Sequence, residues 1–360
     1  MATADTLAGS AQVSAARQWP NPTVSASHSK DIPQRHYALE LPLDLPYLRR
    51  PRIAAAAAGQ RALRARFTYE RASVAMEADT TYTRALAARA LAELASRASQ
   101  DADSLRRLAI ARRDAGSASD MDVALATITA GQAANDAVTD SLAYLSALLD
   151  LQVVMGMTTR DARVTLADSL GAPPPVPLRV DGQALSVAAA ADQLEAAALA
   201  LRVEKRSVFG QPGLTAGWDT GDPNGDTPGR LPTFGVAMPI PLFNRNRAAI
   251  ARAQAEALRA RAELSFVTVL SRTERERAER EYDAARARFE RDEQLVGQAE
   301  RVAVMAMTAY REGAIALPGV LEARRTAREL LVQRIRDAAD AWVAAATLHV
   351  LTLSAPPPAP

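Results

Sequence analysis

Residues 284–287 (AARA) repeat residues 87–90 (AARA) at an offset of 197 positions. The same offset joins further identical residues: Pro42 and Pro239, Leu45 and Leu242, Arg50 and Arg247, Ile53 and Ile250, Gly116 and Gly313, Asp140 and Asp337, Leu151 and Leu348. A register kept without a gap over more than a hundred residues indicates one structural unit used twice.

The repeated unit contains a short strand pair, a very long helix, a tight break and a second long helix. The predicted fold class is therefore mainly α with a small β part. We divide the chain into a first repeat over 1–157, a linker over 158–184, a second repeat over 185–354 and a disordered tail over 355–360.

The first repeat opens with the end of an Ala-rich helix, which Pro20 and Pro22 stop because proline lacks an amide donor and restricts its predecessor. Pro51 is expected in the first turn of a long helix, where proline is tolerated. The predicted elements are a truncated helix over 1–17, a hairpin over 23–45 and helices over 48–113 and 120–157.

The second repeat follows the same plan, with a complete leading helix over 185–207, a hairpin over 213–243 and helices over 246–312 and 317–353. Alternation over 233–243 predicts the second strand of this hairpin. The helix over 246–312 has a 4-3 spacing of small and apolar residues, which is typical of a coiled-coil seam. At ~1.5 Å per residue, this helix reaches roughly 100 Å. Glu276 and Arg280 are expected to pair beside the seam.

Composition excludes several classes of protein. The 43 basic and 41 acidic residues nearly balance, so the net charge of +2 does not indicate nucleic-acid binding. Cysteine is absent, which excludes disulfides and thiolate metal sites. No run of 18 or more apolar residues is free of charge, so no ordinary transmembrane helix is expected. The first residues (MATAD) show no secretory signal.

The two hairpins carry one apolar face each. An isolated hairpin is barely stable in water, so we expect these two to need each other and further subunits. Their faces are compatible with a lipid-facing barrel wall and equally with a small soluble sheet that caps a helical bundle. The aromatic residues expected at a barrel or interface are Trp19, Tyr37, Trp218, Phe234 and Phe243.

Residues 239–253 (PIPLFNRNRAAIARA) resemble the strand-to-helix signature of the outer membrane efflux protein (TolC) family, closest to its heavy-metal efflux, CzcC-like branch. Residues 310–315 (YREGAI) and 320–325 (VLEARR) are similar to the helix-tip motif of that family, and residues 19–22 (WPNP) match the start of its first hairpin. The resemblance covers nearly the whole chain.

The resemblance implies a homotrimer in which four strands per chain close one β-barrel in the outer-membrane lipid. The long helices would form a periplasmic α-helical tunnel that meets a periplasmic adaptor protein and, indirectly, an inner-membrane pump. It implies no enzymatic activity and no cofactor. The expected function is a passive conduit of a tripartite (RND-type) efflux system for heavy-metal cations. The alternatives are a drug or solvent channel of the same family and a soluble elongated coiled-coil scaffold.

The two repeats differ at their beginnings, because the leading helix of the first is shorter than that of the second. The family has a longer first helix after a signal peptide. We therefore expect the natural protein to begin upstream of Met1. The sequence does not identify the transported substrate, the pump or the adaptor.

The breaks between the long helices define predicted tips, with Gly116 and Gly313 expected as C-caps. In a trimer each tip residue occurs three times, so acidic rings there can favour cations and gate the tunnel. The same residues are also explained as helix caps and solvated charges. The candidate tip residues are Asp114, Gly116, Asp120, Asp122, Glu312 and Gly313.

Other motifs carry weaker predictions. His28 and His36 can approach each other across the first hairpin, but two imidazoles without a carboxylate make a weak metal site. Residues 219–226 (DTGDPNGD) lack the EF-hand spacing and are interpreted as a hairpin loop. We find no nucleophile motif, phosphate loop or zinc-helix motif, and predict no metal site.

Overall fold

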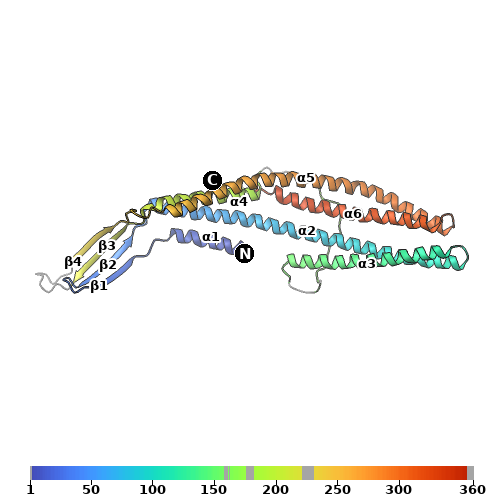
Figure 1. Ribbon diagram of the computed structural model, residues 1–360, viewed down its shortest axis with the longest axis horizontal. Coiled ribbons are helices and arrows are strands. Elements are labelled where there is room, and N and C mark those ends of the chain that lie inside the picture. Colours follow the sequence, from blue (N-terminus) through green and yellow to red (C-terminus); the bar gives the residue numbers. More distant parts are fainter. Residues whose placement is uncertain (1, 158–160, 162, 176–181, 221–230, 355–360) are drawn as a thin grey trace. The chain divides into compact units, whose positions relative to one another are not determined.

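A computed structural model describes the chain apart from residues 1, 158–160, 162, 176–181, 221–230 and 355–360 (Figure 1). It is mainly helical with one small antiparallel sheet. The helices are α1 (Ala2–Arg17), α2 (Pro46–Asp114), α3 (Asp120–Val154), α4 (Leu185–Arg206), the short 3₁₀ helix η1 (Ser207–Phe209), α5 (Arg247–Arg311) and α6 (Leu317–Thr352). The strands are β1 (Thr23–His28), β2 (Arg35–Pro42), β3 (Gly213–Thr220) and β4 (Leu231–Ala237).

These residues form two compact units, which we describe separately. Unit 1 contains residues 1–70, 182–271 and 354–360, and unit 2 contains residues 71–181 and 272–353. Each unit thus takes segments from both sequence repeats. The division into repeats remains a prediction of the sequence.

Unit 1 is organised by a four-stranded sheet of order β1-β2-β3-β4, antiparallel throughout. The central pair joins the two hairpins, with Tyr37 opposite Trp218 and Leu41 opposite Leu214. In Figure 1 the ends of α1 and α4 and the beginnings of α2 and α5 lie next to one end of this sheet. We call this region the sheet–helix junction.

The second hairpin corrects one prediction. Alternation continues to Leu242, but β4 ends at Ala237. Pro239 and Pro241 explain the difference, because proline cannot donate to a strand ladder. The expected strand 233–243 is therefore shorter, and residues 238–243 form an irregular connection to α5.

Pro51 also lies elsewhere in its helix than expected. α2 begins at Pro46, so Pro51 falls in the second turn and cannot donate to the carbonyl of Tyr47, four residues earlier. The Arg206 guanidinium donates to that carbonyl oxygen through Nη1 at 3.3 Å. A side chain of α4 thus replaces the backbone bond that proline removes.

Unit 2 packs α3, α6 and the second parts of α2 and α5. Its seam follows the predicted 4-3 spacing, since Ala278, Tyr282, Ala285, Phe289 and Val296 are all buried. Beside it, the predicted pair of Arg280 and Glu276 is present at 3.9 Å. The small side chains of Ala278 and Ala285 let the helices approach closely at those positions, and Tyr282 and Phe289 fill the space between them.

The described part of the linker lies against unit 2 without regular structure. The buried Gln152 side chain donates to the carbonyl of Asp161 and accepts from the backbone amides of Arg163 and Val164. Leu166 packs into a buried cluster with residues of α2 and α3. Trp342 donates to the Gly171 carbonyl at 3.1 Å. The linker is thus fixed through its own backbone groups.

α3 requires a second correction. It is the one helix in the described ranges that is long and apolar enough to cross a membrane, with a mean hydropathy of 1.3 in its best window. Only 17% of that window is buried. The expectation of no such helix was too strict, because scattered Ala, Leu and Val outweigh the isolated Asp residues.

Candidate functional site: a two-faced sheet and the helix tips

The sheet has one apolar and one polar face. Side chains alternate along a strand, so residues that share a parity and pair across strands share a face. The apolar face carries Val24, Ala26, Tyr37, Leu39, Leu41, Leu214, Ala216, Trp218, Phe234 and Val236, and its polar residues, His28, Arg35 and Thr220, lie together at one end of the strands. Most of its large side chains are exposed, Phe234 to 84% and Val236 to 74%.

The opposite face is mostly small and polar: Thr23, Ser25, Ser27, His36, Ala38, Glu40, Thr215, Gly217, Asp219, Thr233 and Gly235, with Leu231 as its one large apolar residue among the paired positions. Adding a Cβ to Gly217 would place it 2.5 Å from the carbonyl oxygen of Tyr37, so this position tolerates no side chain. The sheet therefore separates an exposed apolar surface from a polar one. Both outer strands, β1 and β4, have one edge without a neighbouring strand among the described residues.

The predicted aromatic residues lie on or next to the sheet. Tyr37 and Trp218 stack across β2 and β3 with ring centroids 5.7 Å apart. Trp19 lies under the guanidinium of Arg49, whose Cζ is 4.7 Å from the ring centroid. Phe243 is fully exposed in the connection between β4 and α5. These positions fit an interface, although their roles remain predictions.

The two histidines of the first hairpin do not converge. His36 pairs with Ser27 across β1 and β2 while His28 pairs with Arg35, so the imidazoles belong to opposite faces. His36 instead has a carboxylate partner that was not expected, with Nδ1 2.9 Å from Oδ1 of Asp219. Within the described residues, no group of three or more potential metal ligands occurs. Of residues 219–226, those from 221 lie outside the described residues.

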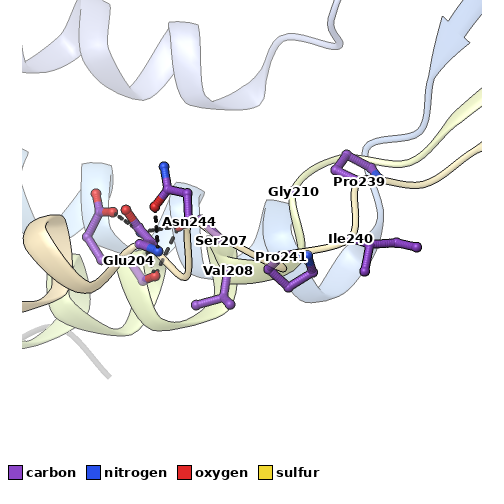
Figure 2. Close-up of a pocket in the computed structure, with 9 residues that line it drawn as sticks. Glu204, Ser207, Val208, Gly210, Pro239, Ile240, Pro241 and Asn244 are labelled. Carbon is purple, nitrogen blue, oxygen red and sulfur yellow. Dashed lines mark hydrogen bonds between the residues drawn. The ribbon is translucent and has the colours of Figure 1, made fainter.

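A shallow pocket of about 330 Å³ lies at the sheet–helix junction (Figure 2). Its wall runs from Glu204 through Ser207 to Gly210 on one side and over Pro239–Pro241 on the other. Asn246, with a positive φ of 54°, donates from Nδ2 to the carbonyl and carboxylate of Glu204 and to the Ser207 hydroxyl. The polar groups of the pocket therefore cap the end of α4.

The first tip joins α2 to α3 in unit 2. Gly116 has a φ of 73°, and Ser117 and Gly116 donate to carbonyls of the last turn of α2, as expected for a C-cap. Ser119 caps α3 by a reciprocal capping box with Asp122. Asp122 therefore has a structural role.

The other two acidic residues of this tip lie on the surface. Asp114 pairs with Arg113 at 2.6 Å, and the same arginine lies 3.9 Å from Asp120. Asp120 is 93% exposed. Of the three, Asp120 is thus the freest to face a solvent path.

The second tip joins α5 to α6 in the same unit. Gly313 has a φ of 78° and closes α5, while Glu312 is exposed and has no ion pair within the described ranges. α6 begins at Leu317 as predicted, with Pro318 in its first turn. Leu317 and Val320 are fully buried against α2 and α3 residues, which anchors this turn.

Arg112 connects the two tips. Its guanidinium donates to the Tyr310 carbonyl and to the Ser117 carbonyl, and its Cζ lies 4.6 Å from the Tyr310 ring centroid. The Tyr310 hydroxyl is buried without a hydrogen-bond partner among the described residues. Burial raises its pKa, against the lowering effect of Arg112. Sequence reasoning missed Arg112, although its place just before the Gly116 break was a usable signal.

α3 presents an exposed apolar stripe: Met121, Ile128, Val138, Leu142, Leu145, Leu149 and Val153. Seven large apolar side chains exposed along one helix are unusual for a helix that faces water alone. They recur mostly at intervals of three, four or seven residues, which places them on one side of the helix. This side is therefore suited to contact with another apolar surface.

No protein-family model and no curated protein matches the sequence. Solved structures do match it. A membrane protein from Pseudomonas aeruginosa is 20% identical with a TM-score of 0.80, and the alignment covers 98% of this chain and 89% of that one. The outer membrane protein VceC from Vibrio cholerae is 19% identical with a TM-score of 0.76, over 98% and 92%. The outer membrane channel CmeC from Campylobacter jejuni is 15% identical with a TM-score of 0.79, over 98% and 81%.

These likenesses show that the chain has the fold of solved outer-membrane channels. They extend over nearly the whole chain, so the sheet and the long helices belong to one shared architecture. The resemblance to the TolC family is thereby supported at the level of the fold.

Proposed function

We propose that the chain is the subunit of an outer-membrane channel, which acts as a passive conduit of a tripartite efflux system. The observation that carries this proposal is the two-faced sheet. An exposed apolar face beside a small, polar face is the pattern of a transmembrane barrel wall, whose outer side chains meet lipid and whose inner ones meet water. A soluble sheet would cover such an apolar face.

The unpaired strand edges support a homotrimer. Four strands are too few to close a barrel, and unpaired backbone groups are costly in lipid. Three copies supply twelve strands and remove every edge when β4 of one copy pairs with β1 of the next. The exposed stripe of α3 gives the helices a surface for the same assembly.

In this proposal the long helices form a periplasmic tunnel, and the tips form one of its mouths. The adaptor protein would dock there, with the inner-membrane pump reached through it. No step of this function needs a catalytic residue, a cofactor or a resident metal. The barrel aromatics Trp19, Tyr37, Trp218, Phe234 and Phe243 would lie at the lipid interfaces.

We further propose heavy-metal cations as the cargo, on the basis of the acidic tip residues. Asp120 and Glu312 are exposed, and a trimer repeats each of them three times, which lowers the energy of a cation in the mouth. A drug or solvent channel of the same fold is the alternative, because the pump rather than the conduit can select the substrate.

A matched pair of substitutions tests the barrel. Val236→Lys puts a charge on the apolar face and should abolish detergent-stable trimers and conductance in planar bilayers. Thr233→Lys, on the polar face of the same strand, should leave both intact. Equal tolerance of the two substitutions, or a water-soluble monomer or dimer without detergent, would favour the soluble scaffold instead.

The cargo is tested with Asp120→Asn and Glu312→Gln in reconstituted trimers. We expect the cation-over-anion permeability ratio to fall in the double variant. Asp122→Asn is a less informative change because Asp122 belongs to the capping box of α3. An unchanged ratio in the double variant would remove the tip acids from selectivity and leave metal transport without support.

A further inference from the structure

Four helix ends are tied together at the sheet–helix junction of unit 1. Arg49 of α2 donates to the carbonyl of Arg17 at the end of α1, and Arg206 of α4 donates to the carbonyl of Tyr47 at the beginning of α2. Asn246, just before α5, binds Glu204 near the end of α4. These contacts bring the basic residues of four separate segments to one end of the sheet.

The junction carries a set of exposed basic side chains that we call the basic collar: Arg17, Arg50, Arg202, Lys205, Arg206, Arg245 and Arg247. None of these seven forms an ion pair within the part of the chain that the structure describes. Two carboxylates near the collar have other partners. Asp44 is buried and paired with Arg52 at 2.7 Å and Arg49 at 3.5 Å, and Glu204 accepts from Asn246.

Several arginines farther along α5 form ion pairs, unlike the collar residues. Along α5, Arg252, Arg272, Arg275, Arg277 and Arg286 each pair with a glutamate four residues later. Five arginines of α5 are thus neutralised within their own helix. Others, such as Arg259 and Arg301, are exposed without an ion pair among the described residues, but only at the junction do seven such basic residues gather from several segments. Exposed positive charges in one place attract an anionic partner, and at about 0.1 M salt this attraction extends over roughly 10 Å before it is screened.

Helix stability does not explain the collar. The beginning of α5 carries Arg247 and no acidic residue in its first turn, and α2 carries Arg50 close to its beginning, where the Asp44 carboxylate is already paired with Arg49 and Arg52. Helix N-termini already have a partial positive charge, so basic residues there are unfavourable. The cost is offset if an anion binds at this end, where both the side chains and the helix dipoles attract it.

The collar borders an exposed apolar surface. Residues of the connection between β4 and α5 are exposed to 63% at Met238, 73% at Ile240, 68% at Leu242 and 100% at Phe243. These residues lie between the end of β4 and the basic residues Arg245 and Arg247 in the sequence. Apolar side chains followed directly by unpaired basic ones match the boundary between lipid tails and anionic headgroups.

We propose that the basic collar binds the anionic phospholipid headgroups of the membrane leaflet that borders the sheet–helix junction. The inference rests on the proposed function, because only a barrel in a membrane brings headgroups to this level. It adds a lipid preference and an anchoring depth to that function. The collar fixes how far the sheet enters the bilayer. Lipid phosphate groups pair with the collar side chains, which have no carboxylate partner among the described residues.

The test is flotation of the purified full chain with two kinds of vesicles. One kind contains phosphatidylethanolamine and phosphatidylcholine, and the other replaces about one quarter of the lipid with phosphatidylglycerol. The wild-type chain should associate roughly tenfold more strongly with the anionic vesicles, and this preference should vanish at about 1 M salt, where the screening length is about 3 Å.

A quadruple variant isolates the collar: Arg50→Gln, Lys205→Gln, Arg245→Gln and Arg247→Gln. The side chains of these four residues make no hydrogen bond or ion pair within the described residues. Its matched control has the same change in charge at exposed, unpaired positions away from the junction: Arg71→Gln, Arg259→Gln, Arg301→Gln and Arg336→Gln. The collar variant should lose the anionic preference and the control should keep it. Replacing Arg50, Arg245 and Arg247 by lysine should also keep it, and circular dichroism verifies that each variant is folded.

Two results would overturn the inference. The first is equal association of the wild-type chain with both kinds of vesicles. The second is an equal loss of preference in the collar variant and in the control, which would assign the effect to net charge alone. Failure of the proposed function is seen separately, as absence of conductance and of detergent-stable trimers in the wild-type chain whatever the lipid.

Discussion

Arg288 donates from Nε to Oδ1 of Asp337 over 2.8 Å, which joins α5 to α6 at a residue that is only 2% exposed. Gln333 donates to the other oxygen, Oδ2, at 3.0 Å. Burial alone would raise the pKa of Asp337, but the hydrogen bonds from Arg288, Gln333 and Asp292 outweigh it and lower the pKa. These hydrogen bonds therefore stabilise the ionised form of Asp337.

Asp292 interrupts the apolar seam of α5. Its environment shifts its pKa in the opposite direction to that of Asp337. Burial and then its hydrogen bond to Asp337 raise the pKa of Asp292, although Arg291 and Arg288 act against this. Its Oδ2 is buried and accepts no hydrogen bond from a described residue. The raised pKa favours the protonated form of Asp292, which can donate to the Asp337 carboxylate. Asp340 lies near as well, 3.8 Å from Arg288.

The two carboxyls give opposite pH dependences. The contribution of Asp337 is present above the unfolded pKa of about 3.9 and is lost as the pH falls through its lowered folded pKa. The contribution of Asp292 is present below about 3.9 and is lost as the pH rises through its raised folded pKa. We expect Asp292→Asn to stabilise the chain by about 1 kcal/mol above that raised pKa and to flatten the loss of stability there.

The measurement is denaturant unfolding of the wild-type chain and the variant across the acidic to neutral range. Asp337→Asn serves as the contrasting change, since it leaves Arg288 without its carboxylate and should cost about 1–3 kcal/mol at neutral pH. If Asp292→Asn destabilises the chain at neutral pH, the predicted repulsion between the Asp292 and Asp337 carboxylates is absent.

Asn246 gives a prediction about the sheet–helix junction. Its side chain caps the end of α4, and its φ of 54° is uncommon for a residue other than glycine. Asn246→Ala should lose both the hydrogen bonds and the tolerance of this φ, at a cost of about 2 kcal/mol. Asn246→Gly keeps the backbone freedom and should cost about half as much.

Thermal unfolding of the two variants in detergent separates the two effects. Equal losses would show that the positive φ contributes nothing and that the hydrogen bonds to Glu204 carry the whole effect. Retention of full stability in both variants would remove Asn246 from the capping of α4.

The repeat explains why much of this architecture could be predicted. Arg49 and Asn246 are 197 positions apart, and each binds the carbonyl end of the preceding helix, Arg49 at Arg17 and Asn246 at Glu204. The same function is thus performed by different side chains at matching positions. Periodicity and prolines predicted the long helices to within a few residues at each end, since these signals are local.

The pairs that cross between distant segments could not be predicted. His36 and Asp219 meet only because β2 and β3 are neighbours in one sheet, which neither hairpin pattern specifies. Arg112 reaches Tyr310 because two helix breaks lie side by side in unit 2. Gln152 fixes a linker that reads as featureless in the sequence. Each depends on tertiary packing, which a single sequence does not encode locally.

Ser119 gives a prediction about the first tip. Its hydroxyl accepts from the backbone amide of Asp122 at 3.1 Å, and the Asp122 carboxylate accepts from the amide of Ser119 at 3.1 Å. Ser119→Ala should cost about 1 kcal/mol and should speed amide hydrogen exchange in the first turn of α3. Ser119→Asp, which retains a capping oxygen, is the control and should restore most of the protection. Unchanged exchange in the alanine variant would mean that the tip is held by its packing alone.

Arg112 gives a prediction about both tips together. Its guanidinium binds the Tyr310 carbonyl, the Ser117 carbonyl and the Tyr310 ring, so it links the break after α2 to the break after α5. Lysine keeps the charge but cannot reach several acceptors with a planar fork. Arg112→Lys should therefore raise amide exchange in residues 310–317 by roughly tenfold, which corresponds to about 1.4 kcal/mol of local stability. Arg113→Lys, which alters a surface pair with Asp114, is the matched control and should leave exchange in this range unchanged. A similar increase in both variants would assign the effect to general loosening of the first tip, and no increase in either would mean that Leu317 and Val320 alone hold the second tip in place.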